Sequence, residues 1–210
     1  MEPNRPQTTA EKQKTIGNVK KGGAALIIAM IASTIAVEGG WVNNPNDPGG
    51  ETNYGVTKKV AVQYGYRGPM RTLPKATAES IHYQGYIVKP GYEPLVDINA
   101  PVVEELYDTA VNMGPTRPSR WFQQIINDVC RKSLPTNGVV DATTIEAFST
   151  CQIPMGAEKM CLTFLDRLDA KQLDEYGRLV RNNPKLKVFY RGWKNNRIGN
   201  VPRSHCKVVS

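Results

Sequence analysis

Histidine and cysteine are scarce in this chain of 210 residues, which contains only two histidines and four cysteines. His82 and His205 are far apart in the sequence and have no evident metal partners, so each is predicted to be an ordinary surface or core residue. No two cysteines have the CxxC spacing that is typical of zinc sites and thioredoxin-like motifs. The sequence therefore predicts that the protein uses neither a metal nor a cofactor.

The four cysteines leave two interpretations open. An even number permits two disulfides if the protein folds in an oxidising compartment. The same residues could instead be small buried hydrophobic side chains with free thiols. These residues are Cys130, Cys151, Cys161 and Cys206.

The chain also lacks a dense run of positive charge, although its net charge is +8. A basic surface favours polyanionic partners such as nucleic acid, anionic lipid or a bacterial cell wall. The lysines and arginines are scattered as pairs, and no zinc-finger, basic-zipper or aromatic-strand signature accompanies them. We therefore expect that the protein does not bind nucleic acid. We also expect it to be a monomer.

One apolar run is present, but it is short. Residues 22–37 carry no charge, and these sixteen residues fall below the roughly 20 that a membrane-spanning helix needs. Ile27, Ile31 and Ile35 repeat every four residues, which predicts a helix buried on one face. A secretory signal or a weak, releasable membrane anchor is the alternative. Residues 1–20 before it are predicted to form a flexible basic tail.

Sustained strand alternation is absent, so the fold class is predicted to be mainly α. After the apolar run comes a polar loop, residues 41–56, which could contain a small β-hairpin. Further helices are expected at residues 57–63, 76–88, 101–113, 119–129, 143–149, 157–179 and 184–195.

The candidate chemistry lies where the apolar helix is expected to end. Gly39-Gly40 is a typical helix terminator, so Glu38 would be the last residue of that helix. Desolvation and the negative end of the helix dipole both favour the protonated form of a carboxyl group placed there. A carboxylic acid that keeps its proton near neutral pH is what the cleavage of a glycosidic bond requires.

The loop that follows supplies candidates for the other roles. Asp47 lies nine residues after Glu38 in a polar environment and could remain ionised, to orient water or to stabilise a positively charged transition state. It could equally be only a turn residue before Pro48-Gly49. Thr52 could hold the attacking water or bond to the loop backbone. Residues predicted to contact substrate are Asn43, Glu51, Tyr54, Trp41 and, later in the chain, Asn112.

These residues resemble the signature of glycoside hydrolase family 108, the N-acetylmuramidases found in many phage endolysins. The matching elements are Glu38-Gly39-Gly40-Trp41, Asn43, Asp47, Gly49-Gly50-Glu51-Thr52 and Tyr54-Gly55-Val56. The resemblance implies a lysozyme-like fold and makes Glu38 the catalytic glutamate. One departure is Tyr86-Ile87, where the family commonly has Tyr-Trp.

The resemblance extends into the C-terminal half. Residues 107–114, 137–141 and 189–197 are similar to segments of the predicted peptidoglycan-binding region of these proteins. We therefore predict a catalytic muramidase region at 21–98 and a helical, peptidoglycan-binding-like region at 99–210. Trp121 and Trp193 are expected to pack in the core.

The resemblance implies an endolysin that cleaves the β-1,4 bond between N-acetylmuramic acid and N-acetylglucosamine and lyses the bacterial host of a phage. It would act in the host periplasm, with residues 22–37 as a transient inner-membrane tether. The alternative is a cytoplasmic enzyme released through a holin. The rival functions are a lytic transglycosylase acting on the same bond and a non-catalytic cell-wall-binding or virion protein.

Overall fold

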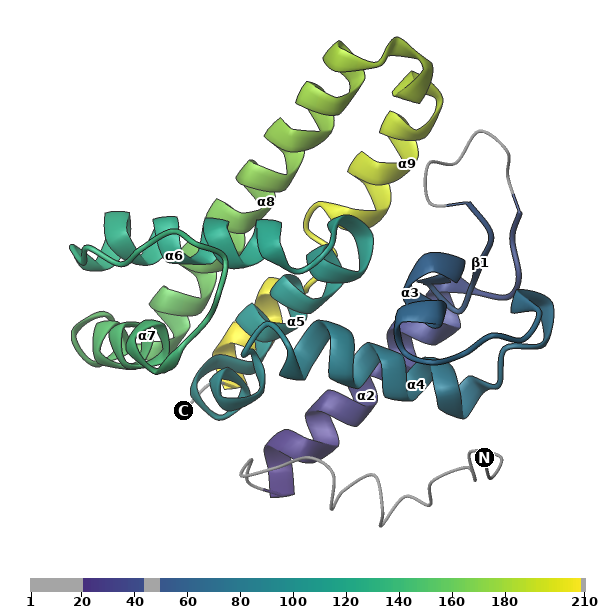
Figure 1. Ribbon diagram of the computed structural model, residues 1–210. Helices are drawn as coiled ribbons and strands as arrows, with labels where there is room; N and C mark the ends of the chain where they lie inside the picture. The colour runs from purple at the N-terminus through teal and green to yellow at the C-terminus, as the bar shows by residue number, and fades with distance from the viewer. Residues whose placement is uncertain (1–20, 44–49, 209–210) are drawn as a thin grey trace. The chain divides into compact units, whose positions relative to one another are not determined.

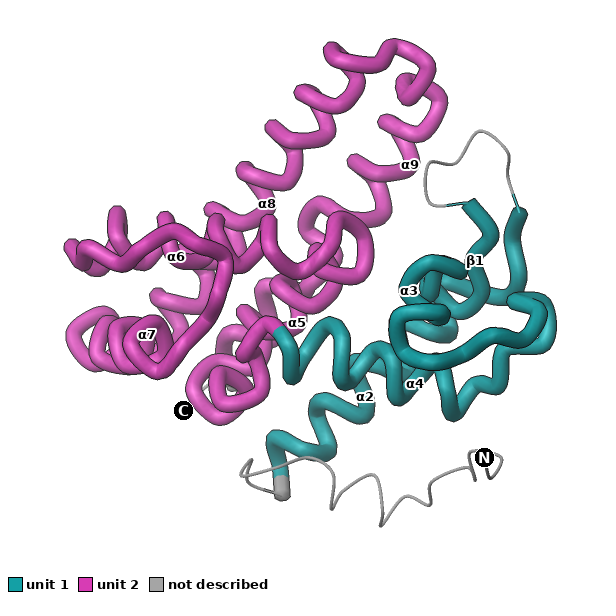
Figure 2. The backbone as a smooth tube through the Cα atoms, viewed as in Figure 1, with its two compact units in different colours: residues 1–89 teal, residues 90–210 magenta. Residues whose placement is uncertain are grey.

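The computed structural model describes residues 21–43 and 50–208 and shows a mainly α-helical protein, which confirms the predicted fold class (Figure 1). The chain divides into two compact units between Lys89 and Pro90 (Figure 2). The functional boundary expected from the sequence lies later, after residue 98. The assignment of catalysis to one region and wall binding to the other stays a prediction.

Within residues 21–43 and 50–89, the first unit has three α-helices and a small β-hairpin. Its elements in chain order are α2 (Lys21–Glu38), β1 (Thr52–Asn53), β2 (Val56–Thr57), α3 (Lys58–Gln63), the 3-10 helix η1 (Met70–Thr72), α4 (Lys75–Tyr83) and the π-helical turn η2 (Gln84–Val88). Helix α2 packs against α4, and the hairpin packs against α3, α4 and η1. The hairpin, which the sequence offered for the loop 41–56, spans residues 52–57.

Helix α2 is buried along one stripe. Ile27, Ile31 and Ile35 are 0%, 5% and 3% exposed, as their four-residue spacing predicted. Leu26 is 47% exposed, so the apolar surface of this helix is wider than the face that the fold covers. No helix in the described parts of the chain is long and apolar enough to cross a membrane.

The second unit is a bundle of α-helices. It consists of the 3-10 helix η3 (Glu93–Leu95), α5 (Val96–Met113), α6 (Thr116–Cys130), α7 (Ala142–Met155), α8 (Ala157–Asn182), η4 (Pro184–Leu186), α9 (Lys187–Arg197) and η5 (Arg203–Val208). Helix α8 packs against α5, α6 and α7, and α9 folds back along it (Figure 1). Every helix predicted in this part of the sequence is present.

The core of the second unit is held by aromatic packing and two disulfides. Phe122, Phe148 and Phe164 from α6, α7 and α8 meet edge to face, with ring centroids 4.8–5.8 Å apart. The bond Cys130–Cys151 joins α6 to α7, and Cys161–Cys206 joins α8 to η5. The cysteines are therefore cross-links rather than free thiols. Trp193 stacks on the buried Tyr176 at 5.0 Å but is itself only partly buried, so it lies at the edge of the core in which the sequence predicted it to pack.

A charged network is also buried in this unit. Arg197 pairs with Asp108 at 2.7 Å, and Arg203 pairs with Asp169. Glu105 lies among these groups, is fully buried and accepts a hydrogen bond from the Thr109 hydroxyl at 3.2 Å. Burial, followed by the charges of Asp169 and Asp108, raises the pKa of Glu105 well above its ordinary value. This carboxyl group is therefore stable in the fold in its protonated form.

The raised pKa of Glu105 predicts a particular pH dependence of stability. As pH rises above the ordinary glutamate pKa, the unfolded chain releases this proton while the folded chain retains it, so the free energy of unfolding falls. Glu105→Gln removes this loss. We expect the stability advantage of the variant to grow with pH, by at most about 1.4 kcal/mol per pH unit, until the carboxyl ionises in the fold.

Urea unfolding between pH 5 and pH 8, with the disulfides intact, measures this difference. Glu146→Gln, which changes an exposed acid on α7, is the matched control. The difference between its free energy of unfolding and that of the parent should stay constant across this pH range. If the free energy of unfolding of Glu105→Gln differed from that of the parent by the same amount at every pH, the role assigned to Glu105 would be contradicted.

Candidate active site

Glu38 is the last residue of α2, as predicted. It follows Ile35 by three residues, so it lies near the buried stripe of the helix rather than on the opposite face. The helix ends there because Gly39 adopts a left-handed conformation, with φ of +72°. The carboxyl group is thus partly buried at the carboxyl end of an apolar helix.

The tip of the β-hairpin lies directly against Glu38. Tyr54 and Gly55 form its two-residue turn, and both have positive φ, +54° and +73°. Such turns match the twist of the paired strands but strain a residue other than glycine. A methyl group added at Gly55 would lie 3.0 Å from Cγ of Glu38. Glycine therefore allows the turn backbone to approach the carboxyl side chain.

His82 forms a hydrogen bond with this turn. Its side chain is fully buried in α4, and its Nε2 lies 2.8 Å from the Tyr54 carbonyl oxygen. A carbonyl oxygen only accepts hydrogen bonds, so Nε2 must carry the proton and donate. Burial lowers the pKa of His82, against the opposing influence of the Tyr54 hydrogen bond and the Glu38 charge. A neutral His82 is thus a fixed donor next to Glu38.

Tyr86 supplies a hydroxyl group in the same neighbourhood. It lies in the π-helical turn η2, and its ring centroid is 5.5 Å from that of His82. Burial, then the charges of Tyr64 and Glu38, raise the pKa of Tyr86 to about 12. The phenol therefore keeps its proton and can donate a hydrogen bond close to Glu38. π-Helical turns are often found at functional sites.

The beginning and end of the loop 41–56 are joined by a second group of contacts. Val42 and Thr52 exchange two backbone hydrogen bonds of 2.9 Å. The Trp41 indole donates to Oε1 of Glu51 at 2.8 Å, and Lys58 pairs with Oε2 at 3.3 Å. The Trp41 hydrogen bond, ahead of the Lys58 contact, lowers the pKa of Glu51. Glu51 is therefore an ionised residue that fixes the loop and not a proton donor.

Two further contacts complete the support of this loop. The Arg71 guanidinium lies over the Trp41 ring, 4.6 Å from its centroid. Asn53 is buried and donates from Nδ2 to the Met70 carbonyl at 2.7 Å, which attaches the hairpin to η1. Trp41 is thus covered on one face by a cation, while the hairpin is fixed at its base.

The residues predicted for the site are placed as follows. Glu38 and Tyr54 come together, and Thr52 lies partly buried in β1 of the same hairpin. Asn43 is exposed next to the Val42–Thr52 bridge. Asp47 lies outside the described residues. Asn112 is in the second unit, where its side-chain oxygen accepts a hydrogen bond of 3.0 Å from the Tyr176 hydroxyl.

Sequence reasoning missed His82 and Tyr86. His82 was taken for an ordinary surface or core residue, and it is indeed in the core, but it contacts the turn that approaches Glu38. The two side chains are four residues apart, which places them on one face of a helix. That spacing predicts a shared helix face, but the sequence does not place this face against the loop 41–56.

A mainly helical fold that brings a helix-terminal carboxyl group against a hairpin tip has a lysozyme-like arrangement. Residues 31–114 match the family model described as Glycosyl hydrolase 108. The protein is accordingly a glycoside hydrolase of the N-acetylmuramidase type, a peptidoglycan-hydrolysing glycosidase.

The solved structure described as "Structure of Brucella abortus SagA" has a similar fold. The two chains are 24% identical, with a TM-score of 0.64, and the match covers 89% of this chain and 96% of that chain. No curated protein matches the chain.

Proposed function

We propose that this protein is an endolysin that hydrolyses the β-1,4 bond between N-acetylmuramic acid and N-acetylglucosamine, with Glu38 as the general acid. The observation that carries this proposal is the contact of Glu38 with the hairpin tip, where Gly55 leaves room for its side chain. The match of residues 31–114 to a glycoside hydrolase family, which includes Glu38 and this hairpin, gives independent support.

In the proposed reaction, protonated Glu38 gives its proton to the glycosidic oxygen as the bond to the anomeric carbon breaks. Positive charge then develops on the sugar ring, and water adds to the anomeric carbon. The water loses one of its protons to a base, for which Asp47 remains our candidate, and Thr52 remains our candidate for holding this water. Glu51 is not our candidate because its contacts with Trp41 and Lys58 lower its pKa and make it a weaker base.

Two neighbours of Glu38, neutral His82 and protonated Tyr86, are hydrogen-bond donors that carry no charge. His82 keeps the turn in place through the Tyr54 carbonyl. Tyr86 offers a hydrogen-bond donor to a sugar hydroxyl or to the attacking water. Both residues therefore act on the geometry of the site while Glu38 transfers the proton.

An extracytoplasmic site of action is supported by the cysteines. All four form disulfides, and such bonds persist in oxidising compartments such as the bacterial periplasm. We propose that the protein acts in the periplasm of a phage-infected host. Association of residues 22–37 with the inner membrane before release remains part of this proposal.

Product analysis tests the reaction type. Purified sacculi digested with the full chain should yield muropeptides with reducing N-acetylmuramic acid ends, because water is the acceptor in hydrolysis. Mass spectrometry distinguishes these from anhydromuramic ends, which are lighter by one water. Predominantly anhydro products would overturn hydrolysis in favour of a lytic transglycosylase, and an unchanged muropeptide profile would favour a non-catalytic wall-binding protein.

A further inference from the structure

The net positive charge of the protein comes from the last part of its sequence. Residues 176–210 contain nine of the 27 lysines and arginines and none of the 19 acids. The first 175 residues therefore carry 18 cations and 19 acids, which nearly cancel. The charge of +8 thus belongs to the end of α8 and to η4, α9 and η5.

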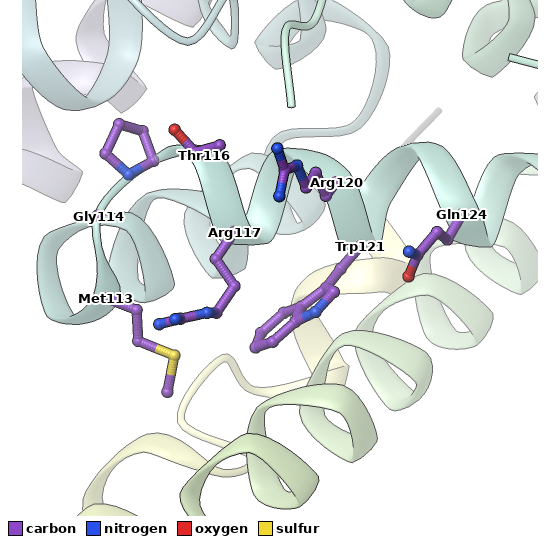
Figure 3. A pocket seen from close by; sticks show the side chains of 8 residues that line it. Met113, Gly114, Thr116, Arg117, Arg120, Trp121 and Gln124 are labelled. Atoms are coloured by element: carbon purple, nitrogen blue, oxygen red, sulfur yellow. The ribbon is translucent and has the colours of Figure 1, made fainter. Parts of the chain in front are cut away.

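Only three of these nine cations are neutralised within the fold. Arg197 and Arg203 belong to the buried network described above, and Arg178 binds both oxygens of Glu175 at 2.7 Å. Glu175 is the last acid in the chain and also lies 3.3 Å from Arg117, which extends from the first turn of α6 (Figure 3). The other six cations are exposed and form no ion pair with a described residue: Arg181, Lys185, Lys187, Arg191, Lys194 and Lys207.

Three of these unpaired cations share one face of α9. Lys187, Arg191 and Lys194 follow one another at spacings of four and three residues, which places them side by side along a helix. The opposite side of α9 carries Trp193, which stacks on Tyr176 of α8 at 5.0 Å. This aromatic contact turns the three cations, which we call the cationic face, away from α8 and toward solvent.

The cationic face lacks compensation from its own surroundings. Like charges three or four residues apart on a helix repel one another, and neither α9 nor the preceding η4 contains an acid. Two further unpaired cations, Arg181 at the end of α8 and Lys185 in η4, come shortly before α9 in the chain. An anionic partner would offset this repulsion, so the charges favour contact with a negatively charged surface.

The side chains that border the cationic face favour a lipid surface. Val188 follows Lys187 and is 77% exposed. Tyr190, on the other border of the face, is partly exposed, and its hydroxyl has no hydrogen-bond partner in the parts of the chain that the structure describes. A valine gains free energy when it leaves water for an apolar layer, and tyrosine suits the boundary between lipid and water. Helices that combine basic and apolar borders in this way lie on membrane surfaces.

Two other anionic partners fit these observations less well. A saccharide needs a concave site, and the pocket shown in Figure 3 lies where α5 ends and α6 begins. Its lining comes from residues between 113 and 124 and not from α9, and it includes the partly buried Trp121, which the sequence assigned to the core. Nucleic acid is not the expected partner in the oxidising compartment that the disulfides indicate.

We propose that the cationic face of α9 binds the surface of an anionic phospholipid bilayer. Lys187, Arg191 and Lys194 contact the lipid phosphates, while Val188 and Tyr190 enter the headgroup region. This contact is separate from the proposed association of residues 22–37 with a membrane, and it does not depend on muramidase activity.

Co-sedimentation of the full chain with sucrose-loaded vesicles at low salt tests the proposal. Vesicles of phosphatidylcholine and phosphatidylglycerol in equal amounts should bind the protein, and vesicles of phosphatidylcholine alone should not. The triple variant Lys187→Gln/Arg191→Gln/Lys194→Gln should lower the partition coefficient on the anionic vesicles by about 10²-fold, because each cation near such a surface contributes about fivefold.

A second triple variant controls for net charge. Lys75→Gln/Lys132→Gln/Lys159→Gln removes the same number of exposed cations from other parts of the surface. It should bind the anionic vesicles within about threefold of the parent, since charges away from the contact are screened. If binding came from residues 22–37, the two triple variants would bind alike, and this result would overturn the proposal.

Val188→Ser tests whether the apolar border enters the bilayer. It should weaken vesicle binding by about threefold or more, because serine loses the gain of burying the valine methyl groups. Ile153→Ser, which changes an 81% exposed side chain on α7, is the matched control and should bind like the parent. Equal binding of the Val188→Ser and Ile153→Ser proteins would contradict the insertion of α9.

Two competing ligands complete the test. A parent protein that bound a single-stranded oligothymidylate in preference to the anionic vesicles would overturn the proposal, as would a parent protein that bound neither. Circular dichroism ensures that only folded variants are compared. Because the vesicles contain no peptidoglycan, reducing-end release without vesicle binding would refute this surface alone, and vesicle binding without reducing-end release would refute the muramidase alone.

Discussion

Glu38→Gln is expected to lower the rate of reducing-end release from sacculi by about 10²–10⁴-fold, the usual contribution of a general acid. Glutamine has nearly the shape of glutamic acid, so it preserves the contact with Gly55 while it cannot transfer a proton to the leaving oxygen. The measurement is the initial rate on purified sacculi at neutral pH, together with co-sedimentation to show that the variant still binds its substrate.

Glu146→Gln is the matched control, since it removes an exposed acid from α7 in the other unit. This variant should retain the parent rate. If Glu38→Gln released reducing ends within about threefold of the parent, a range too small for loss of a general acid, Glu38 would not be the proton donor. Loss of binding together with loss of rate would instead indicate a damaged site.

His82→Ala is expected to lower kcat by roughly 10–100-fold with little change in KM, since small displacements of catalytic groups can cost about 10² in rate. The alanine removes the donor to the Tyr54 carbonyl. The turn Tyr54-Gly55 would then lose a contact that offsets its left-handed strain, and it would no longer hold the Glu38 side chain in one place.

His82→Gln separates this positioning role from mere filling of space. The glutamine amide can place an N–H close to where Nε2 lies, so it should recover a large part of the lost kcat. Steady-state kinetics of the three proteins on soluble glycan strands, with thermal unfolding to verify the fold, gives the comparison. A folded His82→Ala protein with parent kcat, or a glutamine variant no better than alanine, would refute the positioning role.

The substitutions at Glu38 and His82 test two different roles within the same group of contacts. Glu38 is expected to act by chemistry, so no replacement without a titratable proton can restore it. His82 is expected to act by geometry, because its own pKa is lowered by burial and its proton is engaged by the turn. Rescue by a conservative substitution at His82 but not at Glu38 would distinguish the two roles.

Local features of the sequence determined much of the first unit. The four-residue spacing of the isoleucines determined the buried face of α2, because side-chain spacing along a helix depends only on neighbours in the chain. Gly39 determined where the helix ends, because glycine readily adopts the left-handed backbone conformation found there. Thr57 lies directly before α3 and caps it, because its hydroxyl oxygen accepts a 3.3 Å hydrogen bond from the Val60 amide. These features place Glu38 at a helix end before any tertiary contact is known.

Only the tertiary structure decided which distant side chains meet. His82 is 28 residues from Tyr54, and the disulfides close separations of 21 and 45 residues. Periodicity identifies the face of a helix but does not specify what that face touches, and four cysteines allow more than one pairing. The hydrogen bond from His82 to the hairpin turn and the pairing of the cysteines both depend on contacts between residues that lie far apart in the chain.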